Sequence, residues 1–126
     1  MLYKYQDDNK RIAMGILSLA KVRDRADYLE QELHWYNDSK QRNLYLWRDQ
    51  FNNWAGVIGT ESFSSCLVVR RITLTPDVNT VFNIFNVLDD LKQLYPDIPL
   101  QGTLATQNYL NTWEQNNERK KCLNFI

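Results

Sequence analysis

The sequence predicts an α/β domain of the α+β kind, with helices on both faces of a mixed, mostly antiparallel sheet. Residues 66–75 are rich in β-branched side chains and predict a central strand, which Pro76 ends because its ring has no N–H for the ladder. Over residues 78–95 the apolar side chains recur at spacings of three and four, which is typical of a helix. Because this helix precedes a strand at residues 100–105, we expect the two strands to be parallel neighbours.

The other elements follow from the same patterns. We expect strands at residues 2–5, 44–47, 54–60 and 122–126, and helices at residues 12–20, at residues 26–36 and from Thr106, as its cap, through Trp113. The strand at 44–47 is apolar on both faces, which indicates an interior position in a sheet that is covered on each side. Short polar turns join the strands at 44–47, 54–60 and 66–75, so these three should form an antiparallel meander.

Length and charge limit the classes of function. A chain of 126 residues with 44% hydrophobic residues is long enough for one core, so we expect a single domain over residues 1–126. Fifteen basic and fifteen acidic residues give no net charge, and no general field attracts nucleic acid or a membrane surface. The basic cluster at residues 119–121 is typical of a solvated end.

Neither a signal-peptide pattern nor the spacing of metal ligands is expected from these residues. No segment approaches the roughly 20 apolar residues of a membrane helix, and no signal-peptide pattern opens the chain, so a cytoplasmic protein is expected. Cys66 and Cys122 lack CxxC spacing, and His34 is the one histidine. We therefore predict no metal site and two reduced cysteines.

The order of elements and several segments resemble the GNAT N-acyltransferase superfamily. Within it, the chain is similar to the RibT group, the acetyltransferase-like proteins of bacterial riboflavin operons. The segments that carry the resemblance are KRIAMGILS at residues 10–18, LYLWR at 44–48, AGVIGTE at 55–61, RRITLTP at 70–76, and Thr106 with Gln107.

The resemblance implies that the chain binds acetyl-CoA between two splayed parallel strands. The backbone of Ile72, Thr73 and Leu74 would then polarise the thioester carbonyl, while the pantetheine runs between the strands. In the family, the loop after the central strand has the pattern Arg or Gln, x, x, Gly, x, Gly or Ala. This loop holds the pyrophosphate at a helix N-terminus, where free N–H groups and the helix dipole favour an anion.

The chain departs from that loop pattern. Counted from Pro76, the loop positions fall on residues 79–84, so that Asn79 stands at the Arg position and Thr80 follows it. Phe82 and Ile84 occupy the two glycine positions, and Asp77 adds a negative charge beside them. Since phosphate oxygens must reach bare backbone, we expect the phosphate cradle to be absent or remodelled.

The candidate acid and base are Tyr109 and Glu61. Many enzymes of the superfamily use a Tyr seven residues beyond an Asn as general acid, but Thr106 and Trp113 stand at these two positions here. An indole N–H does not ionise near neutral pH, so Tyr109, one helical turn earlier, is the substitute candidate, with core packing as the alternative. Glu61 is the candidate base, and a solvated turn carboxylate is its alternative reading.

Four residues of the second helix are candidates for the acceptor pocket. Tyr28, Trp35 and Tyr36 lie in the region that shapes this pocket in relatives, and exposed aromatic rings there could stack on a flat ligand. Ordinary helix packing is the alternative for all three. His34 lies off the apolar stripe of its helix, so a surface position is its default reading and a substrate role the alternative.

Two hypotheses of function follow. The first is an N- or O-acetyltransferase that uses acetyl-CoA and acts on a riboflavin-pathway compound, another small molecule or a protein amine. The second is a binding or interaction module with this fold that has lost the cofactor and acts, for example, as a homodimer. The fold and the resemblance support the first hypothesis, whereas Asp77, Phe82, Ile84 and Trp113 support the second.

Overall fold

The computed structural model describes residues 1–19 and 26–124, and side chains within these ranges except those of residues 26 and 122–124. Its sheet has five strands in the order β1-β2-β3-β4-β5. They are β1 (Leu2–Lys4), β2 (Arg42–Arg48), β3 (Trp54–Ser62), β4 (Leu67–Leu74) and β5 (Leu100–Gly102). The first three pairings are antiparallel and the β4–β5 pairing is parallel. The predicted fold class and meander are thus confirmed.

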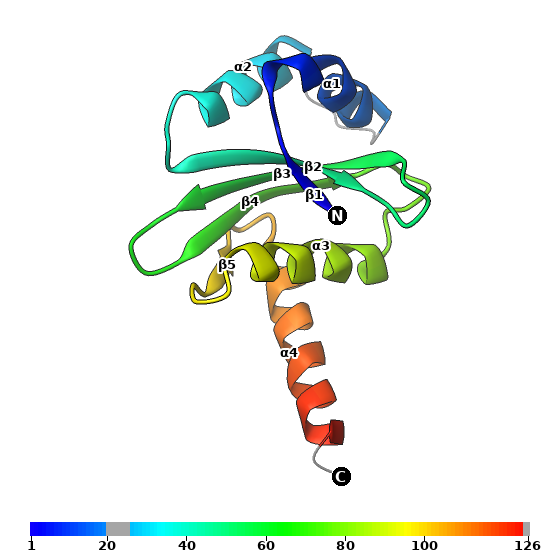
Figure 1. Cartoon of the computed structure of the whole chain (residues 1–126), viewed down its shortest axis with the longest axis vertical. Helices are drawn as coiled ribbons and strands as arrows, with labels where there is room; N and C mark the ends of the chain where they lie inside the picture. Colours follow the sequence, from blue (N-terminus) through cyan, green and yellow to red (C-terminus); the bar gives the residue numbers. More distant parts are fainter. Residues whose placement is uncertain (20–25, 125–126) are drawn as a thin grey trace.

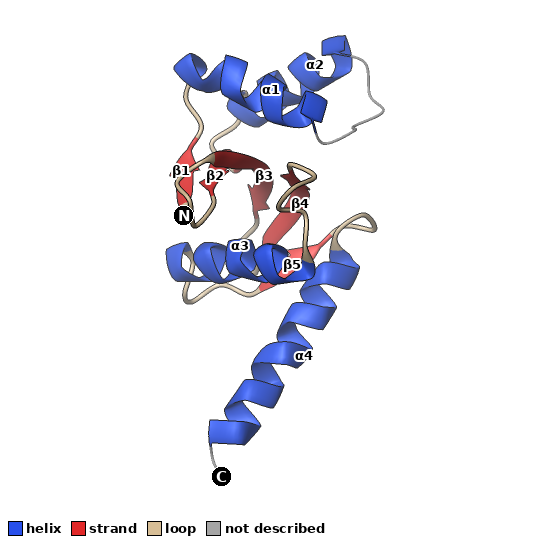
Figure 2. Cartoon of the chain, turned by 90° about the vertical axis from the view of Figure 1, so that its right-hand side faces the viewer, coloured by secondary structure: helices blue, strands red, loops and turns tan. Residues whose placement is uncertain are grey.

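Helices cover both faces of this sheet. They are α1 (Lys10–Leu19), which follows a 3-10 turn at Asp7–Asn9, α2 (Ala26–Asn37), α3 (Val81–Leu94) and α4 (Gln107–Asn124). The helices α1 and α2 lie on one face and α3 on the other, while α4 leaves the body of the molecule and extends away from it (Figures 1 and 2). No helix among the described residues combines the length and the apolar character that crossing a membrane would require.

Two separate cores lie on the two faces. Under α3, Ile58, Val69 and Leu88 are fully buried, and under α1 and α2 so is Val57, beside the nearly buried Leu17. Neighbouring residues of β3 therefore serve opposite cores, as the alternation of side chains along a strand requires. This arrangement explains why β2 and β3 are apolar at successive positions.

A β-bulge at Arg70 changes the alternation along β4. Gly59 pairs with Arg71 and Thr60 pairs with Val69, so that Arg70 is an extra residue with no counterpart on β3. Before the bulge Leu67 and Val69 pack in the α3 core, and after it Ile72 and Leu74 do so. The extra residue thus shifts the alternation by one position.

The predicted start of α3 and the predicted end of β5 are wrong. The helix α3 begins at Val81 and not at residue 78, because residues 76–80 form a turn and Thr80 caps the helix by accepting a bond from the Asn83 N–H at 3.2 Å. The strand β5 ends at Gly102 and not at residue 105, because the chain turns at once into α4.

The predicted last strand at 122–126 is also wrong. The helix α4 continues to Asn124, and residues 125 and 126 lie outside the described residues, as does residue 20 of the first predicted helix. No Gly or Pro follows Trp113, and residues 114–121 are mostly good helix formers, so that nothing in the sequence ends the helix there.

Candidate functional site

The candidate site lies where β4 and β5 separate. The two strands pair over three positions, from Leu67 with Leu100 to Val69 with Gly102. Beyond this point β5 ends, whereas β4 continues to Leu74 with β3 as its partner on one side. The predicted carbonyl-binding residues Ile72, Thr73 and Leu74 lie in this half of β4. Its free edge is where a backbone N–H can meet a ligand carbonyl.

The apex of the splay is held by Thr106 and Gln107. The Thr106 hydroxyl donates to the Val69 carbonyl at 2.6 Å, and the Gln107 side-chain oxygen accepts from the Gly102 N–H at 2.8 Å. A Cβ at Gly102 would lie 2.7 Å from the Gln107 backbone, so the start of α4 packs directly on β5. Thr106 stands directly before α4, as predicted for its cap, and its carbonyl accepts from the Tyr109 N–H at 3.0 Å. Its hydroxyl accepts from the Thr103 N–H and donates to β4, so it also joins the helix start to the sheet.

The start of α3 offers an acyl-CoA diphosphate backbone donors but no cation. The amides of Val81 and Phe82 have no acceptor among the described residues, and they lie at the positive end of the helix dipole. Ile84 is buried in the core, and Phe82 is 70% exposed. No Lys or Arg occurs from Pro76 to Leu91, and the Asp77 carboxylate, which accepts from Thr75 at 2.6 Å, adds negative charge. The residues present therefore fit a diphosphate only in part.

Asn79 and Thr80, the two other predicted cofactor residues, lie at this helix start. Both are exposed, and the Thr80 hydroxyl is engaged in the cap on the Asn83 N–H. The Asn83 side chain donates to the Val78 carbonyl at 2.9 Å, which closes the turn from the other side. The turn before α3 is thus closed by the side chains of Thr80 and Asn83.

The candidate acid and base have different surroundings. Tyr109 lies on the first turn of α4, is 37% exposed, and its hydroxyl has no partner in the described part of the chain. Trp113 is buried and donates its indole N–H to Asp89 of α3 at 2.8 Å, so it joins the two helices. Glu61 lies in β3 and not in a turn, and Arg70 Nη1 donates to its Oε1 at 3.2 Å.

Glu61 belongs to a cluster that sequence patterns did not indicate. We call Trp35, Arg42, Glu61 and Arg70 the arginine–tryptophan cluster. The Arg42 guanidinium lies 4.0 Å and the Arg70 guanidinium 5.0 Å from the centroid of the Trp35 ring, while Arg42 Nε lies 3.8 Å from Glu61. Both carboxylate oxygens of Glu61 therefore face an arginine, and a water-exposed base is absent from this position.

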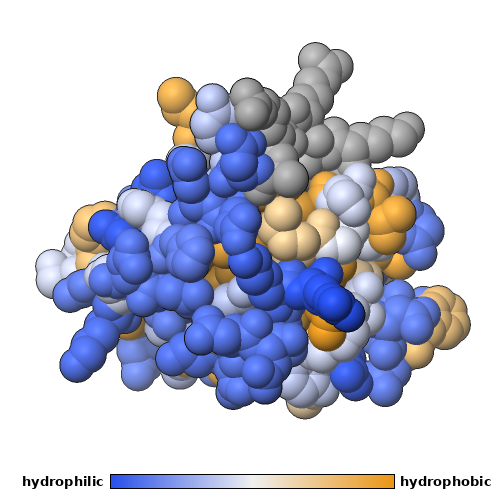
Figure 3. Space-filling view, turned by 90° about the horizontal axis from the view of Figure 1, so that it is seen from above, coloured by the Kyte–Doolittle hydropathy of each residue, from blue (hydrophilic) through white to orange (hydrophobic). Residues whose placement is uncertain are grey.

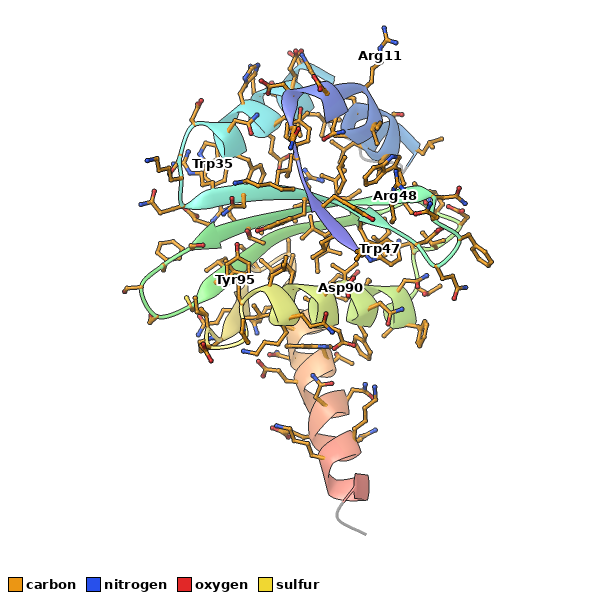
Figure 4. All side chains as sticks on the ribbon, viewed as in Figure 1. Arg11, Trp35, Trp47, Arg48, Asp90 and Tyr95 are labelled. Carbon is orange, nitrogen blue, oxygen red and sulfur yellow. The ribbon has the colours of Figure 1, made fainter. Side chains whose placement is uncertain are left out.

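The predicted aromatic residues of α2 divide into two pairs. Trp35 and Tyr36 lie between α2 and the sheet, with their rings in a T-shaped contact at 5.0 Å, and Figure 4 shows Trp35 beneath α2. Tyr28 and His34 are exposed. Burial, followed by the Glu32 carboxylate, raises the pKa of Tyr36 to about 12, so its hydroxyl stays protonated at neutral pH. Of the four candidates, only Trp35 belongs to the cluster.

A second arginine of the bulge is fully engaged. Arg71 donates to both carboxylate oxygens of Glu32 on α2, at 2.9 and 2.5 Å, and to the Thr73 hydroxyl at 2.9 Å. Arg70 and Arg71 were quoted only as part of a sequence segment, and their roles were not predicted. Two consecutive arginines inside an apolar strand are the sequence signal that could have indicated these two residues.

The surface beside the cluster is hollow. Serines 39, 62 and 64, together with Gln41, Arg42, Glu61 and Phe63, line an open hollow of about 570 Å³. Seen from the side of α1 and α2, the surface is largely hydrophilic, with scattered apolar side chains (Figure 3).

The chain is similar to several N-acetyltransferases. It is 28% identical over 109 residues to an uncharacterized N-acetyltransferase in the lysA 3′ region of Bacillus methanolicus. The aligned residues make up 83% of this chain and 90% of that protein. No protein-family model matches the chain.

Solved structures agree on the fold. An aminoglycoside 6′-N-acetyltransferase of Acinetobacter haemolyticus has a TM-score of 0.63 at 10% identity, over 93% of this chain and 88% of that one. A spermidine N-acetyltransferase variant of Vibrio cholerae has a TM-score of 0.56 at 14% identity, and the match covers 91% of this chain and 76% of that one. An aminoglycoside 6′-N-acetyltransferase in complex with coenzyme A has a TM-score of 0.57 at 12% identity, and the match covers 74% of this chain and 53% of that one. The chain has the GNAT N-acetyltransferase fold.

Proposed function

We propose that the chain transfers an acetyl group from acetyl-CoA to a small-molecule amine. The free edge of β4 beyond Val69 carries this proposal, because it leaves strand backbone unpaired beside an apex fixed by Thr106. The fold supports the same reading, as do the N-acetyltransferase relative and the neighbour that contains coenzyme A.

Two parts of the site bind acetyl-CoA in this proposal, the β4 backbone and the start of α3. Backbone N–H groups of the Ile72–Leu74 stretch bind the thioester carbonyl, and one donor aimed at a developing oxyanion contributes about 3 kcal/mol in a preorganised site. The free amides of Val81 and Phe82, with Asn79 and Thr80 beside them, receive the diphosphate. The Asp77 carboxylate opposes that anion, so we expect acetyl-CoA to bind weakly.

Tyr109 is the proposed acid. The amine nitrogen attacks the thioester carbonyl carbon, the C–S bond breaks, the thiolate takes a proton from the Tyr109 hydroxyl, and the amine loses one to water. Because both oxygens of Glu61 face arginines, we assign Glu61 no part in this proton transfer. Replacement of Tyr109 by Phe should lower kcat on the order of 100-fold.

Calorimetric titration and thermal unfolding with acetyl-CoA test the proposal. Ligand at ~100 times Kd adds roughly 2.7 kcal/mol to the free energy of unfolding and should raise Tm by several degrees. Desulfo-CoA serves as a second ligand that keeps the nucleotide, and thiol release from acetyl-CoA with a panel of amines measures turnover. No binding of either ligand at millimolar concentration would overturn the proposal.

One observation favours a second candidate function. The start of α3 combines a carboxylate with no cation, which suits a module that has this fold without using coenzyme A. Such a module could pair with a second copy or bind a protein, and sedimentation velocity would detect the former. A link to riboflavin metabolism is supported by the resemblance of segments such as residues 10–18 and 44–48 to the riboflavin-operon group. Flavin precursors therefore belong in the panel of acceptors.

A further inference from the structure

On the face of β4 toward α2, the described ion pairs join more arginines than carboxylates. Three guanidinium groups, of Arg42, Arg70 and Arg71, meet two carboxylates, of Glu32 and Glu61. Glu32 is engaged by Arg71 through two hydrogen bonds, and Glu61 is shared between the other two arginines. Among the residues that the structure describes on this face, the three arginines thus share two carboxylates, and Arg42 and Arg70 have Glu61 in common.

Arg70 is the most accessible of the three arginines. Its side chain is 40% exposed, against 26% for Arg42 and 18% for Arg71. Arg70 donates to Glu61 through Nη1 at 3.2 Å, while its Nε and Nη2 groups have no acceptor among the described residues. Two such donors on one planar guanidinium match the two oxygens of a carboxylate.

The bulge places this arginine at the apex of the splay. Val69 is the last residue of β4 that pairs with β5, its carbonyl receives the Thr106 hydroxyl, and Arg70 follows immediately as the bulged residue. A bulge commonly redirects a side chain next to a site. The side chain of Arg70 reaches Glu61 of β3 and the Trp35 ring of α2, so the guanidinium lies on the α2 face of the sheet, while its backbone stands next to the apex.

We propose that Arg70, stacked on Trp35, binds a carboxylate of the acyl acceptor, so that the preferred acceptor is an amine with an anionic group, such as an amino acid. Trp35 and Arg42 hold the guanidinium in place, since Arg42 packs against the ring and also donates to the Trp35 carbonyl at 3.0 Å. A polyamine would need carboxylates that are not already paired, but Glu32 and Glu61 both face arginines here. This inference rests on the proposed acyl transfer.

Matched amines test the inference without acetyl-CoA. L-phenylalanine and phenethylamine differ by one carboxylate, and L-glutamate and spermidine extend the comparison in charge. Binding is followed by the NMR shift of the Trp35 indole N–H and by calorimetry. We expect each carboxylate-bearing amine to bind at least ten times more tightly than its partner, with an affinity that falls as salt rises.

Substitutions then assign the effect to Arg70. In Arg70→Gln the preference for the carboxylate should fall about tenfold, and Arg70→Lys should restore part of it. Arg11→Gln makes the same change of charge at an exposed position of α1, far from the sheet in Figure 4, and should leave the preference unchanged. The inference would be overturned if the Arg70 and Arg11 variants lost the carboxylate preference equally. It would also be overturned if spermidine bound more tightly than L-glutamate, or if neither L-phenylalanine nor L-glutamate bound.

The two proposals fail separately. If acetyl-CoA does not bind but the carboxylate preference depends on Arg70, the anion site stands without acyl transfer. If acetyl-CoA binds and polyamines are acetylated as readily as amino acids, the transfer stands and the anion site is wrong.

Discussion

At the scale of single residues, Gly59 shows how closely α2 packs on the sheet. A Cβ at this position would lie 2.2 Å from the Tyr36 hydroxyl and 2.3 Å from its ring, and Tyr36 is only 2% exposed. Replacement of Gly59 by Ala should therefore lower the free energy of unfolding by roughly 1–3 kcal/mol, as overpacking does. Urea unfolding measures the change.

Gly15 provides the matched control for that substitution. It lies in α1, and a Cβ there meets no atom within 4 Å. Gly15→Ala should stabilise the protein by about 0.5–1 kcal/mol, because Ala is the better helix former. Equal effects of the two substitutions would show that α2 does not pack on Gly59 in this way.

The buried Tyr36 hydroxyl makes stability depend on alkaline pH. Its pKa is raised from about 10 to about 12, first by burial and then by the Glu32 carboxylate. Between these values the folded chain holds a proton that the unfolded chain has lost, so stability is constant below pH ~10 and falls as pH rises toward 12.

Between pH 8 and pH 11 the expected loss from Tyr36 is about 1.4 kcal/mol. Tyr45, whose pKa is raised by burial and by its hydrogen bond with Tyr95, should add to the loss in the wild-type chain. Urea unfolding at pH 8 and pH 11 should therefore show a smaller decrease for Tyr36→Phe than for the wild type. Identical decreases would mean that Tyr36 ionises as freely in the folded chain as in the unfolded one.

At the scale of elements, the start of α3 decides whether the fold can use coenzyme A. The helix presents two free amides, but Asp77 places a negative charge nearby. Asp77→Asn keeps an oxygen that can accept the Thr75 hydroxyl and removes the charge. We expect acetyl-CoA to bind several-fold more tightly in this variant at low salt, with a smaller gain at high salt.

Calorimetric titration measures the gain, and Asp97→Asn is the control. Asp97 is exposed in the turn beyond the other end of α3, so its neutralisation changes net charge by the same amount at a distance from the helix start. A gain of the same size in both variants would reflect net charge alone and would contradict a local effect of Asp77.

The element order was predictable because its signals are local. Polar turns and the change from strand to helix spacing after Pro76 gave the meander and the parallel pair. The bulge at Arg70 was not predictable, since it is a property of register between β3 and β4. The arginine–tryptophan cluster was missed for a related reason: its four members come from α2, β2, β3 and β4, and only the tertiary fold brings them together.

At the scale of the whole molecule, the second half of α4 packs little on the body of the domain. Leu110 and Trp113 are buried in the α3 core, but none of the residues 114–121 is buried, and the helix extends beyond the body in Figure 1. A helical segment without tertiary contacts is marginal in water. Its second half should therefore open easily, although its first half is fixed at the apex of the splay.

Amide hydrogen exchange of the intact chain tests this expectation. Protection should be high through Trp113 and should fall steeply over residues 114–121, while α3 amides near Leu88 and Leu91 exchange last because both side chains are fully buried. Uniform protection along α4 would contradict the expectation and indicate that something covers the helix in solution. If that protection disappeared on dilution, a second copy of the chain would be covering the helix, which would support the second candidate function, a module that forms a homodimer.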